Sequence, residues 1–113
     1  MNPAEARLDD DVEGVLQRTR GDFVAGFPAT CAAMAQLIDG LRDDAGDARR
    51  QELAALLHRM GGLAGTIGFP TVGSHARELE DLVRDTASDR IDRSHAHQAL
   101  DALRLAFEQE RGE

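Results

Sequence analysis

Residues 48–67 of the chain read ARRQELAALLHRMGGLAGTI. At about 100° per residue, most apolar side chains of this stretch fall on one side of a helix, which predicts an amphipathic helix. His58 falls on the opposite side, at the centre of the predicted solvent face. The stretch therefore predicts a helix that packs against a core and presents a histidine to solvent. The apolar side is formed by Leu53, Leu56, Met60, Leu63, Ala64 and Ile67.

Turn-forming residues divide the chain on either side of this helix. A first helix is predicted at about 4–24, and a second is predicted to begin at Pro28, since proline is favoured in the first turn of a helix. Gly68 and Pro70 end the helix that carries His58 and begin the next one. A last helix is predicted around Leu100, Leu103 and Phe107 from their spacing.

Short connections between amphipathic helices favour antiparallel neighbours. The fold class predicted is therefore all-α, an antiparallel up-down four-helix bundle at about 28–110 with an extra N-terminal helix. The length of 113 residues suits a single domain over 1–113. A monomer is expected, and a dimeric bundle would show the same periodicity.

Composition excludes several classes of function. The chain has 13 basic and 21 acidic residues, a net charge of −8, four Phe and no Trp or Tyr. This argues against binding to nucleic acid or to anionic membranes. The single Cys31 excludes an internal disulfide and a cysteine-based zinc site, and its position predicts a buried, unreactive thiol. Without a signal-peptide pattern or a membrane-spanning run, a cytoplasmic location is expected.

The predicted solvent face around His58 lacks long charged side chains. Each interior glycine costs about 1 kcal/mol relative to alanine, out of a total stability of roughly 5–15 kcal/mol. One interpretation is close helix packing, which on this face requires another molecule. The other is a docking platform around a histidine whose neutral ring nitrogen can accept a phosphoryl group. The residues of this face are Gln51, Ala54, Ala55, Gly61, Gly62 and Gly65.

The segment LLHRMGGLAGTIGF at residues 56–69 resembles the signature of histidine-containing phosphotransfer (Hpt) domains. Leu79-Glu80 resembles the Leu-Glu pair that usually follows this motif, and the similarity extends over about Phe23 to Phe107. The resemblance implies that His58 is the phosphoacceptor and that Gly62 lets a receiver domain approach. Gly61 stands where the family usually has a lysine.

The resemblance also implies a set of partners and roles. Arg59, Gly61, Gly62 and Gly65 are expected to contact a response-regulator receiver domain or a hybrid histidine kinase. Arg59 and Arg77 are candidates to neutralise the phosphoryl group in place of the missing lysine. The domain itself is expected to be a carrier rather than an enzyme and to need no cofactor, with Mg²⁺ supplied by the receiver.

Two other functions remain open from the sequence. A phosphate-free scaffold or antagonist would dock a receiver or kinase through the same glycine-rich face. A metal-binding bundle would use His97, but His95 and His97 diverge by about 200° on one helix, which is poor ligand geometry. No metal site is therefore predicted.

Overall fold

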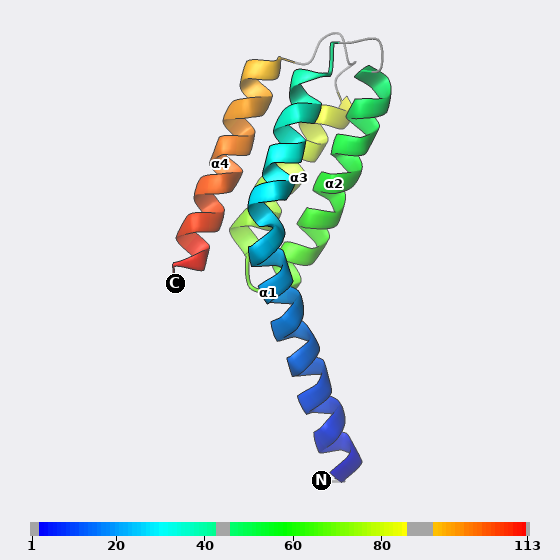
Figure 1. Cartoon of the computed structure of the whole chain (residues 1–113), viewed down its shortest axis with the longest axis vertical. Coiled ribbons are helices and arrows are strands. Elements are labelled where there is room, and N and C mark those ends of the chain that lie inside the picture. The colour runs from blue at the N-terminus through cyan, green and yellow to red at the C-terminus, as the bar shows by residue number, and fades with distance from the viewer. Residues whose placement is uncertain (1–2, 43–45, 86–91, 113) are drawn as a thin grey trace.

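The chain folds as an all-α bundle, as predicted. The computed structural model describes residues 3–42, 46–85 and 92–112, with side chains from residue 12 onward. These residues form four helices: α1 (Pro3–Asp39), α2 (Gly46–Thr66), α3 (Pro70–Asp85) and α4 (Arg93–Arg111). The helices alternate up and down (Figure 1), and contacts join α1 to α2, α2 to α3, α3 to α4 and α4 to α1.

The predicted break before Pro28 is absent, and one continuous α1 replaces the two helices expected there. Inside a helix, proline removes one backbone hydrogen bond and its ring crowds the carbonyl four residues earlier, at a cost of about 3 kcal/mol, but its fixed φ is itself helical. Phe27 and Cys31, on either side of Pro28, are both buried in the core. Their burial holds α1 against the bundle on both sides of Pro28, so the proline does not end the helix.

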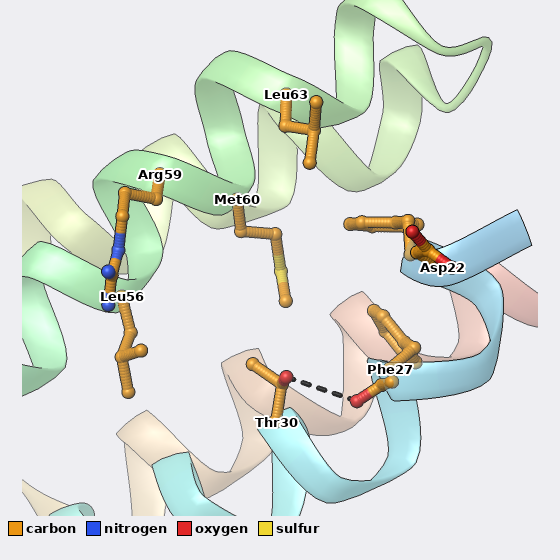
Figure 2. A pocket seen from close by; sticks show the side chains of 9 residues that line it. Asp22, Phe27, Thr30, Leu56, Arg59, Met60 and Leu63 are labelled. Atoms are coloured by element: carbon orange, nitrogen blue, oxygen red, sulfur yellow. Dashed lines mark hydrogen bonds between the residues drawn. The ribbon is translucent and has the colours of Figure 1, made fainter. Parts of the chain in front are cut away.

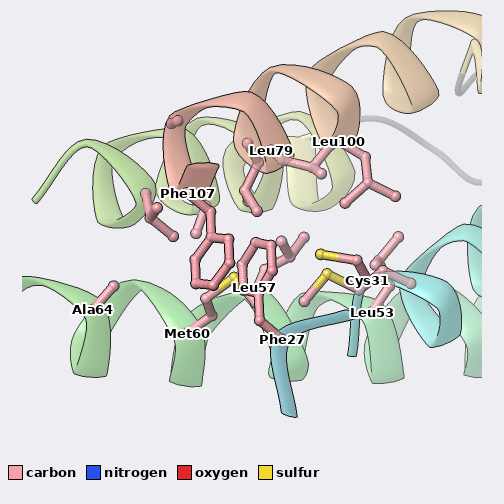
Figure 3. Packing of buried hydrophobic residues seen from close by; sticks show 14 of the residues in the cluster. Phe27, Cys31, Leu53, Leu57, Met60, Ala64, Leu79, Leu100 and Phe107 are labelled. Atoms are coloured by element: carbon pink, nitrogen blue, oxygen red, sulfur yellow. The ribbon is translucent and has the colours of Figure 1, made fainter. Parts of the chain in front are cut away.

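The core combines aliphatic side chains from all four helices with a cluster of phenylalanines. Phe27 of α1 stacks on Phe107 of α4, with ring centroids 3.8 Å apart and planes 8° apart. Phe69, in the α2–α3 turn, lies 5.5 Å from Phe107. Figure 3 shows Phe27 and Phe107 packed beside Leu57 and Met60 of α2.

The α2–α3 turn is closed by backbone geometry that the sequence predicted. Gly68 has a φ of 94°, which a residue with a side chain rarely adopts. The N–H of Phe69 donates to the carbonyl of Ala64 at 2.8 Å, the hydrogen bond of a Schellman cap. Arg20 of α1 adds a hydrogen bond to the carbonyl of Ile67 at 2.8 Å. The turn therefore fixes how α3 returns along α2.

The N-terminal half of α1 extends past the end of the bundle (Figure 1), and the molecule measures 58 × 27 × 21 Å. Within the described residues, no helix combines the length and the hydropathy that crossing a membrane requires.

Candidate functional site

The buried face of α2 is rotated from the face that the hydropathy pattern predicted. Its buried residues include Ala54 and Gly61, both of which were expected on the solvent face. Leu63 is exposed and Leu56 is only half-buried, although both were expected in the core. His58 is exposed as predicted, with 74% of its side chain accessible, but it lies beside α3 instead of opposite the core.

Close packing between α2 and α3 explains this rotation. A Cβ atom on Gly61 would lie 3.2 Å from Cγ of Arg77 and 3.6 Å from the carbonyl oxygen of Gly73. A Cβ atom on Gly73 would lie 3.3 Å from the carbonyl oxygen of Gly61. Gly61 therefore faces α3 within the same chain, and the expectation that it contacts a partner is wrong. Gly62 and Gly65, by contrast, have open space above them.

His58 pairs with a carboxylate from the neighbouring helix. Its Nδ1 atom lies 3.2 Å from Oε2 and 3.4 Å from Oε1 of Glu80 on α3. Oε2 of Glu80 also accepts a hydrogen bond of 2.6 Å from Nε of Arg84. The side chain of Glu80 is only 12% exposed, so a nearly buried carboxylate holds a largely exposed imidazole.

The surroundings of Glu80 keep its carboxylate charged. Burial raises the pKa of Glu80, but the hydrogen bonds from Arg84 and His58 outweigh burial and lower the pKa below its ordinary value. A charged carboxylate accepts a hydrogen bond from the N–H at Nδ1 of a neutral imidazole, and the other nitrogen, Nε2, then carries the free lone pair. With this tautomer, Nε2 is the ring nitrogen whose lone pair is available to a reaction partner.

Glu80 was not among the predicted site residues. The sequence signal for it was the Leu79-Glu80 pair, which the family resemblance marks without assigning it a role. Periodicity places Glu80 on α3 but does not indicate which residue of α2 it meets, because that depends on how closely α2 and α3 approach at Gly61 and Gly73.

The two candidate cations lie on opposite sides of His58. Arg77 borders a depression of about 420 Å³ together with His58, Gly62, Glu80 and Asp81. Its Nη2 atom donates to the carbonyl of Gly61 at 3.3 Å, which holds the guanidinium near the imidazole. Arg59 instead lines a second depression, on the α1 side of α2.

This second depression, the α1–α2 groove, has a volume of about 300 Å³ and is mainly apolar. Figure 2 shows Leu56, Met60 and Leu63 of α2 facing Phe27 and Thr30 of α1 across it. Leu56 and Leu63, which were expected in the core, therefore border a groove next to the face of α2 that carries His58. Its other lining residues are Asp22, Phe23, Gly26 and Arg59.

His97 and His75 each pair with a different carboxylate. Nε2 of His97 lies 2.7 Å from Oδ1 of Asp39, which joins α4 to the end of α1. Nδ1 of His75 lies 3.8 Å from Oε2 of Glu78. In the described parts of the chain, no three His, Cys, Asp or Glu side chains gather closely enough to hold a metal ion.

Cys31 is buried as predicted, with its thiol inside the core. Burial raises the pKa of Cys31, and a hydrogen bond and the charge of Arg104 offset only part of this rise. The thiol therefore stays protonated, which agrees with the prediction of an unreactive cysteine.

Comparison with known proteins identifies the family. The Hpt domain family matches residues 20–112, most of the chain. No curated protein and no solved structure matches the chain. Hpt domains are phosphocarriers rather than catalysts, and they work with receiver domains and histidine kinases in phosphorelay signalling. The family match, together with an exposed histidine on the second helix of an all-α bundle, shows that this chain belongs to the Hpt domain family.

Proposed function

We propose that this chain carries phosphoryl groups on Nε2 of His58 between the aspartates of two receiver domains. The donor is a receiver carrying an aspartyl phosphate, either free or within a hybrid histidine kinase, and the acceptor is a second receiver. The contact between His58 and Glu80 is the observation that carries this proposal, because it orients the ring and leaves Nε2 free at an exposed position.

The transfer exchanges one bond to phosphorus for another. The lone pair on Nε2 of His58 attacks phosphorus, an N–P bond forms, and the P–O bond to the donor aspartate breaks. The electrons of that bond stay on the departing carboxylate. With Nδ1 still protonated, the phosphorylated ring is formally cationic, and the Glu80 carboxylate at 3.2 Å balances this charge. Transfer to the second receiver is the reverse reaction with a different carboxylate.

Arg77 is the cation best placed to meet the phosphoryl group. It shares the depression with His58 and comes from α3. It can therefore supply the positive charge of the lysine that the family usually has at the position of Gly61. The absence of a side chain at Gly61 leaves the space that the aliphatic part of Arg77 fills. Arg59 lies in the α1–α2 groove and is better placed to contact the receiver surface.

The receiver docks, in this proposal, on the exposed face of α2. Gly62 and Gly65 present bare backbone beside His58, which lets an active site approach the ring. The α1–α2 groove next to them offers apolar contact area at Leu56 and Leu63. We assign Mg²⁺ and the catalytic carboxylates to the receiver, and place the relay in the cytoplasm.

Chemical phosphorylation tests the proposed acceptor without a partner. The protein is incubated with phosphoramidate, a small phosphodonor, and its intact mass is recorded at neutral pH. We expect one acid-labile phosphoryl group on the parent and on the control His75→Gln, and none on His58→Gln. A folded parent that gains no phosphoryl group, or a His58→Gln variant that gains one, would contradict the proposal.

A second measurement separates the carrier from a phosphate-free scaffold. A receiver bearing an aspartyl phosphate is mixed with the parent or with His58→Gln, and both binding and transfer are followed. A carrier transfers phosphate only with His58 present. A scaffold binds the receiver equally in both forms and takes up no phosphate.

A further inference from the structure

An acidic residue, Asp81, borders the depression beside His58. Asp81 lines this depression together with His58, Gly62, Arg77 and Glu80, and it is exposed. An exposed carboxylate is charged at neutral pH. Asp81 therefore brings a negative charge to the place where a negatively charged phosphoryl group must arrive, although the transfer itself does not require it.

The charge of Asp81 is not balanced by a basic partner in the described part of the chain. Arg77 and Asp81 are four residues apart on α3, so they lie on one side of this helix, one turn apart. Arg77 donates to the carbonyl of Gly61, and Arg84 pairs with Glu80. Among the side chains that the structure describes, no basic one forms an ion pair with Asp81. Its charge therefore acts on whatever enters the depression.

We propose that Asp81 determines which phosphodonors react with His58, by disfavouring small anionic donors that are free in solution. Arg77 attracts such an anion to the depression, and Asp81, one turn away, offsets this attraction. This inference rests on the proposed function, since it requires that His58 accepts the phosphoryl group.

A receiver domain is disfavoured less by the same charge. In the proposed function, the aspartyl phosphate of the receiver arrives together with Mg²⁺, and the charge of this ion offsets much of the charge on the phosphoryl group. Asp81 then repels a free donor more strongly than a receiver. The result is a carrier that takes its phosphoryl group from protein partners in preference to small acyl phosphates, which carry no signal.

Phosphoramidate serves as the free donor in the test. Nε2 of His58 forms a bond to phosphorus while the P–N bond of the donor breaks, and the protonated amino group leaves as ammonia with the electron pair of that bond. Asp81→Asn removes the charge at nearly constant size and is expected to raise the rate about two- to fivefold at low ionic strength. Asp81→Glu keeps the charge and should react as the parent does.

Asp101→Asn is the matched control, because it makes the same change in residue type and net charge on α4. Asp101 is exposed and lines neither the depression beside His58 nor the α1–α2 groove, so its replacement should leave the rate unchanged. Added salt should reduce the difference between Asp81→Asn and the parent, because it screens exposed charges. A change in packing would not respond to salt in this way, and circular dichroism verifies that each variant keeps its bundle.

The outcomes separate this inference from the proposed function. A parent that is phosphorylated as fast as Asp81→Asn at low ionic strength would overturn the inference and leave the proposed function standing. An acceleration that Asp101→Asn shares, or that salt does not reduce, would also overturn it. A folded parent and a folded Asp81→Asn variant that both gain no phosphoryl group would contradict the proposed function, and this inference with it.

A phosphorylated receiver in place of phosphoramidate tests the preference directly. Asp81→Asn should change the rate of transfer from the receiver less than it changes the rate with phosphoramidate. An equal or larger acceleration with the receiver would show that Asp81 does not distinguish the two kinds of donor.

Discussion

Nδ1 of His58 on α2 lies 3.2 Å from Oε2 of Glu80 on α3, so the two helices meet at the exposed face through an imidazole and a carboxylate. The two side chains differ sharply in environment, since His58 is largely exposed and Glu80 is nearly buried and bound to Arg84. The buried partner is fixed, and it orients the exposed one. This asymmetry underlies the first two predictions.

Replacing Glu80 is expected to slow phosphorylation of His58 while leaving the bundle folded. Glu80→Gln keeps a hydrogen-bond acceptor but removes the charge that balances a phosphorylated ring, and a hydrogen bond to a charged group is stronger than a neutral one by about 1–1.5 kcal/mol. We therefore expect a rate with phosphoramidate roughly tenfold lower. The control Glu78→Gln alters a carboxylate of α3 that pairs with His75. Equal rates in both variants would show that Glu80 plays no part.

The same carboxylate is expected to affect stability in acid. The pKa of Glu80 in the folded chain lies below its ordinary value of 4.5, because Arg84 and His58 outweigh burial. Its contribution is therefore fully present above pH 4.5 and is lost as the pH falls below this value toward the folded pKa. Urea unfolding of the parent and Glu80→Gln should show a difference in free energy that shrinks over this range. A difference independent of pH would contradict the lowered pKa.

Arg77 and Arg59 are expected to behave differently when each is replaced. Arg77→Ala removes the cation beside His58 and should lower the rate of reaction with phosphoramidate, whereas Arg59→Ala should leave this rate unchanged. Arg59→Ala should instead weaken binding to a receiver. The reaction rate and the affinity for a receiver are measured for both variants in parallel. A slower reaction in Arg59→Ala and an unchanged one in Arg77→Ala would show that the α1 side of α2 holds the phosphate.

A long side chain at Gly62 is expected to block docking without disturbing the fold. Nothing lies within 4 Å of the position a Cβ would take, so Gly62→Arg projects outward beside His58. Binding to a receiver, measured by calorimetry, should fall while reaction with phosphoramidate persists. The control Gln98→Arg adds the same charge on an exposed part of α4. Undiminished binding by Gly62→Arg would remove this face from the proposed interface.

Alanine is expected to have opposite effects at two glycines of the α2–α3 pair. Gly62→Ala adds helix propensity in open space and should stabilise the chain by up to about 1 kcal/mol. Gly73→Ala places a Cβ 3.3 Å from the carbonyl oxygen of Gly61. Because this oxygen belongs to the backbone of α2 and cannot move away easily, the variant should destabilise the chain by about 1–3 kcal/mol. Thermal unfolding measures both. Stabilisation by Gly73→Ala would show that the helices separate at little cost.

The helix order and most helix ends could be predicted from the sequence because turn residues mark them locally. Gly68 and Pro70 predicted the end of α2 and the start of α3 within a residue or two. The continuity of α1 could not be predicted, because Pro28 is a local signal that burial of Phe27 and Cys31 overrides. The Asp92 side chain, which caps α4 by accepting from the N–H groups of Ser94 and His95, was also missed.

The site was predicted less completely than the fold. His58, Gly62 and Arg77, which were all named as candidates from the sequence, line one depression, but the sequence did not predict that they would lie together. The predicted buried face of α2 was wrong. The hydropathy pattern depends mainly on large side chains, whereas Gly61 packs against α3 through its backbone. Glu80 was missed for the same reason, since its contact with His58 depends on that close approach.

The short α2–α3 turn bears on the order in which the chain folds. Contacts between residues close in sequence form fastest, because closing a small loop loses little chain entropy. His58 and Glu80 are 22 residues apart, whereas the Arg20 contact that ties α1 to this turn spans 47. We therefore expect the α2–α3 hairpin to assemble early and α1 to dock on it later. His58 and Glu80 would then come into contact before α1 completes the core.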